Sequence, residues 1–383
     1  MNSVAQLVDS CLHDAIERNA SDIHLSCTPQ TLAIKYRIDG VLYPIQNHEH
    51  ALMLPIISRI KILAHINIAQ KRIPQDGKIA FNHQERIIDM RVSTFPGIYG
   101  EKVVIRILDR HAHALTLAQL GFLPSMLDQF KKLVNRSHGF FLVTGPTGSG
   151  KTTTLYAVLQ SLQSPEKNIV TLEDPVEYNL EGITQGQVHP LAGFTFEKGM
   201  RALLRQDPDI AMIGEIRDKQ TAEIAIQAAL TGHLVLSTLH TNDAPSAVIR
   251  LMDMGVESFL INACLTGVLA QRLARTICTT CRIEYEPNDH EKELMHHYAI
   301  NSGTLFKGQG CNACNFLGYK GRTGIFELLV MTDALRALII RHPVIEQIYQ
   351  QVRADGFKTL LHDGACKVQI GNISLTELMR VLI

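Results

Sequence analysis

The chain has 383 residues, of which 46% are hydrophobic and 19% are charged. This balance excludes a disordered or low-complexity protein and predicts a globular one of two or three domains. Lysine plus arginine equals aspartate plus glutamate at 37 each, and no tryptophan occurs. We therefore expect no direct nucleic-acid binding, although a local basic ring could hide within this balance.

Neither the start of the chain nor its longest stretch of low charge indicates export or membrane insertion. The first 18 residues lack the basic flank and the continuous apolar run of a signal peptide. The longest stretch of low charge, residues 258–271, is too short for a membrane span and predicts a buried helix. We expect a cytoplasmic protein whose eight cysteines serve in metal binding or burial rather than in disulfides.

Residues 1–110 predict a small α+β domain. Two helices are expected, at 5–17 and 52–64. Six strands are expected, at 22–25, 32–38, 41–45, 78–81, 86–94 and 102–108. The pair Asp39-Gly40 is a strong signal for a two-residue hairpin turn. Residues 111–118 are expected to form a linker.

From residue 119 to residue 276 the pattern changes to alternating strands and helices. Four apolar strands are expected, at 140–144, 168–172, 210–214 and 233–239. The alternation predicts an α/β domain with a mostly parallel sheet and helices on both faces. A cysteine-rich insertion at 277–322 follows, and the remaining residues, 323–383, are expected to be helical.

A phosphate-binding loop (P-loop) follows the strand expected at 140–144. It matches G-x-x-x-x-G-K-[ST], and the residues are Gly145, Pro146, Thr147, Gly148, Ser149, Gly150, Lys151 and Thr152, with Thr153 opening the next helix. Such a turn surrounds phosphate oxygens with backbone N–H groups at a helix N-terminus. We expect Lys151 to reach the β- and γ-phosphates and the Thr152 hydroxyl to bind Mg²⁺. The sequence therefore predicts a site for a nucleoside triphosphate, with a structural glycine-rich turn as the minor alternative.

Acidic residues follow two strands of the predicted sheet. Glu215 ends the strand at 210–214 and is the candidate general base that orients the attacking water. Glu173 and Glu177 follow the strand at 168–172. They are expected to belong either to a solvated loop or to a site for Mg²⁺ or water, in which Glu173 is the candidate ligand. Asp218 is better suited to cap a helix or to pair with Arg217.

Two histidines bracket the strand at 233–239. His233 and His240 are seven residues apart, so on a two-residue period they face opposite sides. A lone histidine is usually an ordinary core or loop residue. Between the two, His240 at the exit of the strand is the better candidate for sensing the γ-phosphate.

Arginines within apolar strands either face solvent or reach a fixed anion. Arg91 and Arg106 are of this kind, and the local pattern alone favours solvent. ATPases with a P-loop need a positive group near the γ-phosphoryl oxygens, which these two could supply if the first domain closes over the nucleotide. Further candidates are Arg201, Arg205 and Arg217.

Four cysteines form two C-x₂-C pairs separated by 29 residues. They are Cys278, Cys281, Cys311 and Cys314. Four thiolates in this arrangement suit tetrahedral Zn²⁺ in a structural site without an open catalytic position. The remaining cysteines, Cys11, Cys27, Cys264 and Cys366, are expected to be buried hydrophobes.

Together these motifs resemble those of the secretion traffic ATPase family, which powers type II secretion and type IV pilus assembly. Residues 37–40 (RIDG) and 72–77 (RIPQDG) resemble its N-terminal domain. The motor domain is matched by the P-loop, an acidic box at 170–178, the segment 213–218 and a histidine box at 231–243. Residues 310–322 resemble the metal-binding element of the secretion and assembly branch, which the pilus-retraction branch usually lacks.

The resemblance implies a RecA-like P-loop motor domain, a PAS-like N-terminal domain and a C-terminal zinc-binding insertion with helices. It implies ATP and Mg²⁺, a homohexamer, and inner-membrane platform proteins as partners that hold the ring at the membrane periphery. Arg91 and Arg106 match phosphate-contacting positions of the family, and positions linked to activity or assembly match Arg201, Arg205, Arg217 and Arg322. Family members usually begin with a further docking domain, whereas this sequence starts almost directly in the domain that follows it.

Three functions are compatible with these motifs. The leading hypothesis is a mechanochemical ATPase that drives secretion or pilus assembly. The same engine could serve DNA uptake or conjugative transfer. The third is a scaffold that binds ATP and hardly hydrolyses it, and the presence of Glu215 and of both boxes counts against that.

Overall fold

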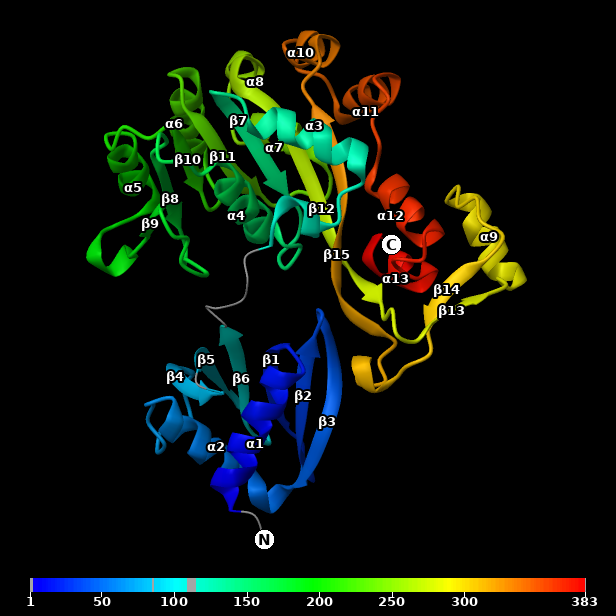
Figure 1. Cartoon of the computed structure of the whole chain (residues 1–383). Helices are drawn as coiled ribbons and strands as arrows, with labels where there is room; N and C mark the ends of the chain where they lie inside the picture. The colour runs from blue at the N-terminus through cyan, green and yellow to red at the C-terminus, as the bar shows by residue number, and fades with distance from the viewer. Residues whose placement is uncertain (1–2, 85, 109–114, 383) are drawn as a thin grey trace. The chain divides into compact units, whose positions relative to one another are not determined.

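The computed structural model describes residues 3–84, 86–108 and 115–382 (Figure 1). The chain forms two compact units, Met1–Ala112 and His113–Ile383. Residues 111–114 of the expected linker lie outside the described residues. Within the described part, no helix combines the length and the apolar character needed to cross a membrane.

The first unit has six strands and two α-helices, as the sequence predicts, and the strands form one antiparallel sheet. Its strand order is β3-β2-β1-β6-β5-β4. The elements are α1 (Val4–Glu17), β1 (Ala20–Cys27), β2 (Thr31–Ile38), β3 (Val41–Glu49), η1 (His50–Leu52), α2 (Met53–Leu63), β4 (Gln75–His83), β5 (Arg86–Gly97) and β6 (Gly100–Leu108). Every second residue of β2 is buried, as expected of a strand with one face against a core. Asp39 and Gly40 have φ of 49° and 83°, so both are left-handed, as the predicted two-residue hairpin turn requires.

The second unit contains a seven-stranded sheet in the order β15-β12-β7-β11-β10-β8-β9. Its strands are β7 (Gly139–Thr144), β8 (Ile169–Glu173), β9 (Thr184–Gln187), β10 (Ile210–Ile213), β11 (Leu234–Leu239), β12 (Leu265–Ile277) and β15 (Tyr319–Val330). All neighbours pair in parallel except β12 and β15. This confirms the expected mostly parallel sheet, whose carboxyl ends meet at one edge.

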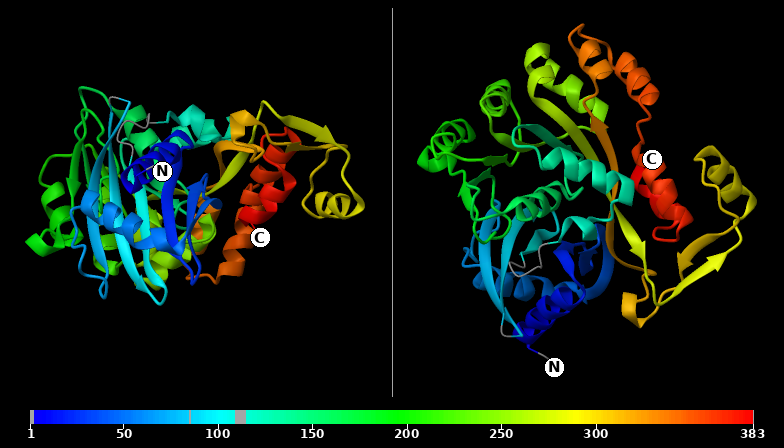
Figure 2. Two further views of the ribbon diagram at one scale, coloured as in Figure 1. Left: turned by 90° about the horizontal axis from the view of Figure 1, so that it is seen from below. Right: turned by 45° about the horizontal axis from the view of Figure 1, so that its top comes forward.

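Helices cover both faces of this sheet (Figures 1 and 2). The helical segments of this unit outside the insertion are η2 (Leu117–Leu120), α3 (Pro124–Val134), α4 (Lys151–Leu162), η3 (Pro190–Ala192), α5 (Phe196–Leu203), α6 (Lys219–Leu230), α7 (Ala244–Asp253), α8 (Ser258–Cys264), α10 (Asp333–Ile339), α11 (Ile345–Ala354), α12 (Leu360–Gln369) and α13 (Leu375–Leu382). Along β7, Phe140 and Leu142 join one hydrophobic cluster, whereas Phe141 and Val143 join another. Because alternate residues of a strand face opposite sides, both faces of the sheet are buried.

Two predictions about the second unit are wrong. Residues 258–271, expected to be one buried helix, form α8 only as far as Cys264, and β12 begins at Leu265. Residues 323–383, expected to be helical throughout, begin within β15, whose antiparallel partner is β12. Both strands are buried over most of their length, so they lack the alternation of a half-buried strand. In addition, β12 follows α8 with no turn residues between them, so the apolar run fits the continuation of a helix equally well.

The cysteine-rich insertion lies between β12 and β15. It contains β13 (Arg282–Tyr285), α9 (Asp289–His297), β14 (Leu305–Gly308) and η4 (Asn312–Cys314). β13 and β14 form a separate two-stranded antiparallel sheet, and α9 connects them (Figure 1). The cysteine pairs flank this hairpin, one after β12 and one before β15.

Candidate functional site

The P-loop, residues 145–152, connects β7 to α4, and its glycines have a conformation that other residues adopt at a cost. Gly145, Gly148 and Gly150 have φ of 147°, 78° and 87°. A Cβ atom on Gly145 would lie 2.5 Å from the carbonyl oxygen of Gln271. Helix α4 begins at Lys151, two residues earlier than the sequence suggested.

The loop meets the requirements of a phosphate site. No side chain caps α4, so the N–H groups of its first turn are available to an anion. The buried hydroxyl of Ser149 has no hydrogen-bond partner among the described residues. A Cβ atom on Gly148 would meet no atom within 4 Å, so open space lies beside the loop. Thr152 and Thr153 are half-buried in the same first turn. These donors and this space fit the phosphates of a nucleotide.

Lys151 is held by the loop that it belongs to. Its Nζ donates to the carbonyl oxygens of Gly145 (2.9 Å) and Pro146 (3.2 Å) and lies 3.5 Å from Nδ1 of His240. Burial lowers the pKa of Lys151, and the nearby charge of Glu215 opposes that shift. An ammonium group with neutral partners gains from exchanging them for phosphate oxygens.

Glu215 and His240 follow β10 and β11, which are adjacent parallel strands, so both side chains lie at the same edge of the sheet. Nε2 of His240 is 3.3 Å from Oε2 of Glu215. Because the ammonium of Lys151 only donates, Nδ1 of His240 accepts, and its Nε2–H donates to Glu215. Arg217 donates to the other oxygen of Glu215. Lys151, His240 and Glu215 are thus connected by a series of contacts, with His240 in the middle.

Glu173 lies in a different environment from the one that the sequence suggested. Its side chain is 2% exposed, and its oxygens accept hydrogen bonds from Tyr156, Thr171 (2.5 Å) and Gln185 (3.2 Å). Burial raises the pKa of Glu173, and these hydrogen bonds oppose that shift. Glu177 is exposed, so the two carboxylates that were expected together differ in surroundings.

The other polar candidates have local partners. His233 Nδ1 lies 2.9 Å from the carbonyl oxygen of Ala228, in the turn between α6 and β11. Asp218 caps α6 by accepting from the N–H of Thr221 (2.8 Å), which confirms the capping role. Arg201 lies 3.6 Å from Glu197 on α5, and Arg205 donates to the carbonyl oxygen of Arg201 (2.8 Å).

Two residues beside the P-loop were missed by the sequence analysis. Gln271 of β12 donates to the carbonyl oxygen of Ser149 (2.6 Å) and accepts from the hydroxyl of Thr154 (2.8 Å). Arg272 donates to the carbonyl oxygen of Asn242 (2.8 Å), two residues after His240. The available signal was a Gln-Arg pair inside an apolar segment. This pair indicates a site residue only when the segment is known to be a strand beside β7.

The first unit carries a row of charged residues across five strands. The register pairs Lys78 with Arg91, Arg91 with Arg106, Arg106 with Asp22, and Asp22 with Arg37. Arg106 Nε donates to Asp22 (3.0 Å), and Arg37 lies 3.7 Å from the same carboxylate. Lys78, Arg91 and Arg106 also line a cavity of about 540 Å³. Like charges directly opposite one another destabilise a sheet, so this row favours a bound anion.

The four cysteines of the insertion come together. Their sulfur atoms all lie within 4.8 Å of one another. The Cys278–Cys311 distance is 3.9 Å, and the Cys281–Cys314 and Cys311–Cys314 distances are 3.8 Å. Four thiolates bound tetrahedrally to zinc at about 2.3 Å would lie about 3.8 Å apart. The cluster therefore fits Zn²⁺.

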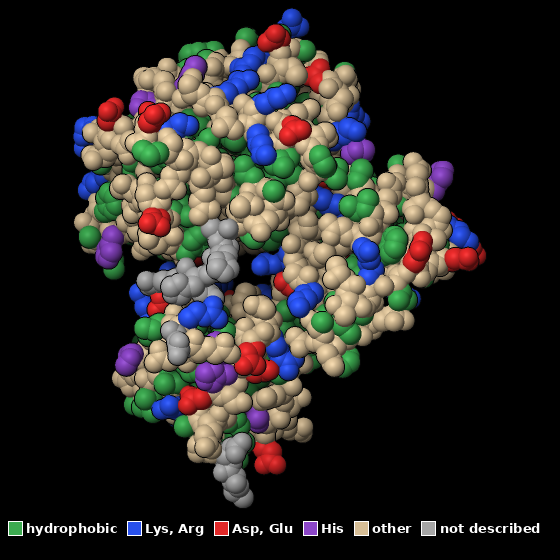
Figure 3. All heavy atoms as spheres, viewed as in Figure 1, with side chains coloured by type: hydrophobic (Ala, Val, Ile, Leu, Met, Phe, Trp, Pro, Cys, Tyr) green, Lys and Arg blue, Asp and Glu red, His purple; other side chains and the backbone are tan. Residues whose placement is uncertain are grey.

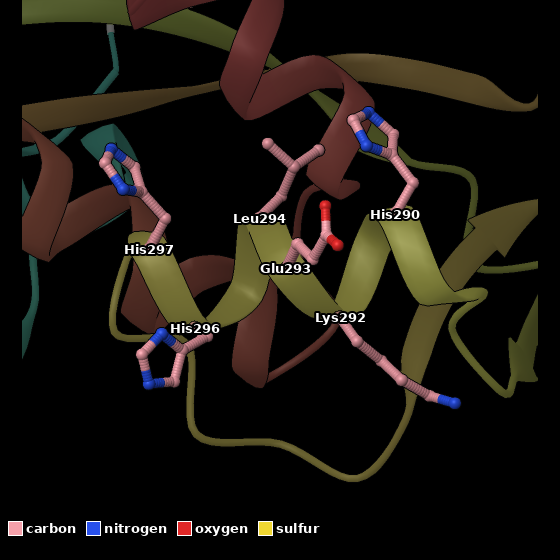
Figure 4. Close-up of a pocket in the computed structure, with 6 residues that line it drawn as sticks. All are labelled: His290, Lys292, Glu293, Leu294, His296 and His297. Atoms are coloured by element: carbon pink, nitrogen blue, oxygen red, sulfur yellow. The ribbon is translucent and has the colours of Figure 1, made fainter.

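A second concavity, of about 600 Å³, lies along α9 of the insertion (Figure 4). His290, Leu294 and His297 point to one side of the helix, whereas Lys292 and His296 point to the other. All of its lining residues belong to α9, so it is an open helix surface. Of the described residues, the four cysteines alone form a group of three or more possible metal ligands.

Solved structures share this fold. The pilus retraction motor PilT with bound ADP is 26% identical, with a TM-score of 0.63 over 97% of this chain and 96% of that chain. The ATPase DotB of Legionella pneumophila is 20% identical, with a TM-score of 0.70 over 98% of this chain and 94% of that chain.

Curated relatives match almost the whole chain. Type II secretion system ATPase E of Vibrio cholerae is 49% identical over 378 residues, 99% of this chain and 75% of the relative. Type II secretion system protein E of Dickeya dadantii is 49% identical over 379 residues, with the same coverage of both chains. The family described as type II/IV secretion system protein matches residues 1–380, and the chain belongs to that family.

Proposed function

We propose that this chain is an ATP-hydrolysing motor that powers type II protein secretion by driving pseudopilus assembly. The observation that carries the proposal is the chain of contacts from Lys151 through His240 to Glu215 beside an uncapped P-loop. The relatives that match over 99% of the chain are type II secretion proteins, which favours secretion over pilus assembly, DNA uptake and conjugation.

The residues of the site divide the chemistry of phosphoryl transfer among them. Lys151 and the first turn of α4 bind the β- and γ-phosphates, and the Thr152 hydroxyl would hold Mg²⁺. Magnesium supplies charge that neutralises the phosphate oxygens. Glu215 orients the attacking water and accepts its proton. His240 donates to Glu215 through Nε2–H, which fixes the carboxylate and links it to the position of Lys151.

Glu173 serves the same site less directly. Its oxygens already have three donors, so a role as a magnesium ligand requires some of those bonds to be exchanged when nucleotide binds. Because Tyr156 lies on α4 and Gln185 on β9, such an exchange would link the P-loop helix to the edge of the sheet.

Arg91 and Arg106 supply positive charge to the γ-phosphoryl group when the first unit closes over the nucleotide. The row of like charges in that unit and the cavity beside it support this assignment. Closing and reopening through the ATP cycle would then convert hydrolysis into movement.

The working form is a homohexamer on the cytoplasmic face of the inner membrane, where it acts on platform proteins of the secretion apparatus. The cysteine cluster would hold Zn²⁺, and the bound metal would brace the insertion between β12 and β15. Light scattering of the purified chain, with and without a non-hydrolysable ATP analogue, measures the oligomeric state and so tests whether the hexamer forms.

Three variants test the ATPase. Glu215→Gln should bind ATP like the native chain and lose turnover, whereas Lys151→Ala should lose both. Glu223→Gln is the control, because Glu223 is a half-buried residue of α6 whose carboxylate forms a surface ion pair with Lys219 (3.6 Å) and lies outside the P-loop site. Unchanged turnover in Glu215→Gln would remove the residue from the role of base. In the native host, the same variant should leave exported proteins in the periplasm, and normal secretion would contradict the cellular role.

A further inference from the structure

A groove of about 540 Å³ lies in the second unit, away from the P-loop. It is lined by α3, by the end of β15 and by the segment from the end of α11 to the start of α12. Its volume is within the range of sites that bind ligands. None of its lining residues belongs to the nucleotide site or to the cysteine cluster.

The floor of the groove is apolar. Met126 and Leu133 of α3, Leu328 of β15 and Val352 of α11 are buried, and Phe357 is half-buried beside them. These side chains belong to the hydrophobic clusters on both faces of the sheet, so the floor is rigid. It offers a surface into which apolar side chains of a ligand can insert.

The rim of the groove is basic. Lys132, Arg136 and Lys358 line it, and none of them forms an ion pair with a carboxylate of the described residues. The one acidic lining residue, Asp355, already accepts hydrogen bonds from Thr332 (2.7 Å) and Gln351 (2.8 Å). Figure 3 shows Lys and Arg side chains gathered over the part of the unit that Figure 1 labels α3.

The lining of the groove carries three cationic side chains and one carboxylate, Asp355, so its net charge is positive. Lys358 Nζ lies 3.1 Å from Nε2 of His362 rather than against an acid. Burial lowers the pKa of Arg336, the charge of Arg136 lowers it further, and the charge of Asp333 raises it. The field over the groove therefore favours a negatively charged occupant.

We propose that this groove is a docking site for an acidic amphipathic peptide segment of a partner protein. Apolar side chains of the segment fill the floor, and its carboxylates meet Lys132, Arg136 and Lys358 at the rim. The apolar contact lies at the bottom of a concave surface, which a protruding peptide reaches and a planar layer of lipid headgroups does not. The site goes beyond the ATPase and does not depend on it.

The probe is a fluorescent helical peptide of about 14 residues, roughly four turns, with leucines on one face and glutamates on the other. The full chain should bind it. The double variant Lys132→Glu/Arg136→Glu should bind it at least about tenfold more weakly. Lys131→Glu is the matched control, because Lys131 is exposed on the same helix but does not line the groove, and its affinity should equal that of the native chain.

Further measurements separate this proposal from other occupants. A peptide with lysines in place of the glutamates should not bind. Raising the ionic strength from about 0.05 M to about 0.5 M should weaken the binding of the acidic peptide to the chain. Equal affinity in the double variant and in Lys131→Glu would overturn the proposal. The proposal would also be overturned if the chain bound phosphatidylglycerol vesicles through the rim residues but did not bind the peptide. The same holds if the double variant changed its oligomeric state while its affinity for the peptide stayed unchanged. Basal ATP turnover of the double variant should equal that of the native chain. A loss of peptide binding can therefore be distinguished from a loss of ATPase activity.

Discussion

The side-chain amide of Gln271 donates a hydrogen bond of 2.6 Å to the carbonyl oxygen of Ser149, within the P-loop. The oxygen of the same amide accepts from the hydroxyl of Thr154 in α4 (2.8 Å). Gln271 is 1% exposed. One buried side chain therefore fixes both the loop and the start of the helix that together bind phosphate.

The variant Gln271→Leu should impair the nucleotide site. It leaves the carbonyl of Ser149 and the hydroxyl of Thr154 without partners, at a cost of about 1–3 kcal/mol for each buried group. Because both groups belong to the phosphate cradle, we expect weaker ATP binding and a higher KM, measured by calorimetry and steady-state kinetics.

The control for this prediction is Thr266→Val on the same strand. Thr266 is also buried, and its hydroxyl donates to the carbonyl oxygen of Phe140 (3.0 Å) at the opposite end of β7 from the P-loop. It should lower the unfolding midpoint without changing KM. Equal effects of both variants on KM would show that Gln271 acts only through general stability.

Local signals in the sequence were enough for much of the fold. The hairpin at Asp39-Gly40 and the P-loop each depend on a few consecutive residues with special backbone angles, so they could be predicted from the sequence. β12 and β15 could not, because β12 follows α8 with no loop between them, and the partners that define both strands lie far away in the sequence.

The site shows the same division. The positions of Glu215 and His240 follow from parallel strands that end at one edge. The surroundings of Glu173 do not, because its donors come from three different elements: Tyr156 from α4, Thr171 from β8 and Gln185 from β9. Partners of a buried side chain depend on tertiary packing, which no local pattern records.

Arg91→Gln and Arg106→Gln should each lower ATP turnover, on the order of 10²-fold. The expected reason is loss of a positive charge that the transition state needs. Lys102→Gln is the control: Lys102 is an exposed residue of β6, the strand that carries Arg106, and lies outside the cavity. Native turnover in both arginine variants would mean that the row of charges serves another anion.

The purified chain should contain about one zinc per molecule by elemental analysis. Cys311→Ser should abolish zinc binding and lower the unfolding midpoint, because the free energy of metal binding that holds the two cysteine pairs together is lost. Cys366→Ser, outside the cluster, should retain the metal. Absence of zinc from protein prepared under reducing, metal-replete conditions would contradict the assignment.

Glu327 should make stability depend on pH. Its side chain is 3% exposed and accepts from the N–H groups of Ala244 (2.7 Å) and Leu360 (2.9 Å), the first residues of α7 and α12. Burial raises the pKa of Glu327 to about 7, from an ordinary value of 4.5, against the effect of the two N–H groups. Nearby Asp243 raises this pKa further, whereas Arg272 lowers it.

A carboxyl group whose pKa is raised by folding binds its proton more tightly in the folded chain. Its stabilising contribution is therefore complete below about pH 4.5, falls as the pH rises towards 7, and is lost above that. The shift corresponds to about 3 kcal/mol at most. Glu327→Gln removes this dependence, because an amide does not titrate, and loses one of the two hydrogen bonds at every pH.

The difference in unfolding midpoint between the native chain and Glu327→Gln should thus be largest near about pH 5 and shrink towards about pH 8. Thermal unfolding followed by circular dichroism measures it, and groups common to both proteins cancel in the difference. Glu197→Gln is the control, since Glu197 is 46% exposed and 3.6 Å from Arg201. The difference in unfolding midpoint between the native chain and Glu197→Gln should stay constant with pH. If the difference for Glu327→Gln were constant as well, Glu327 would be ionised across this range.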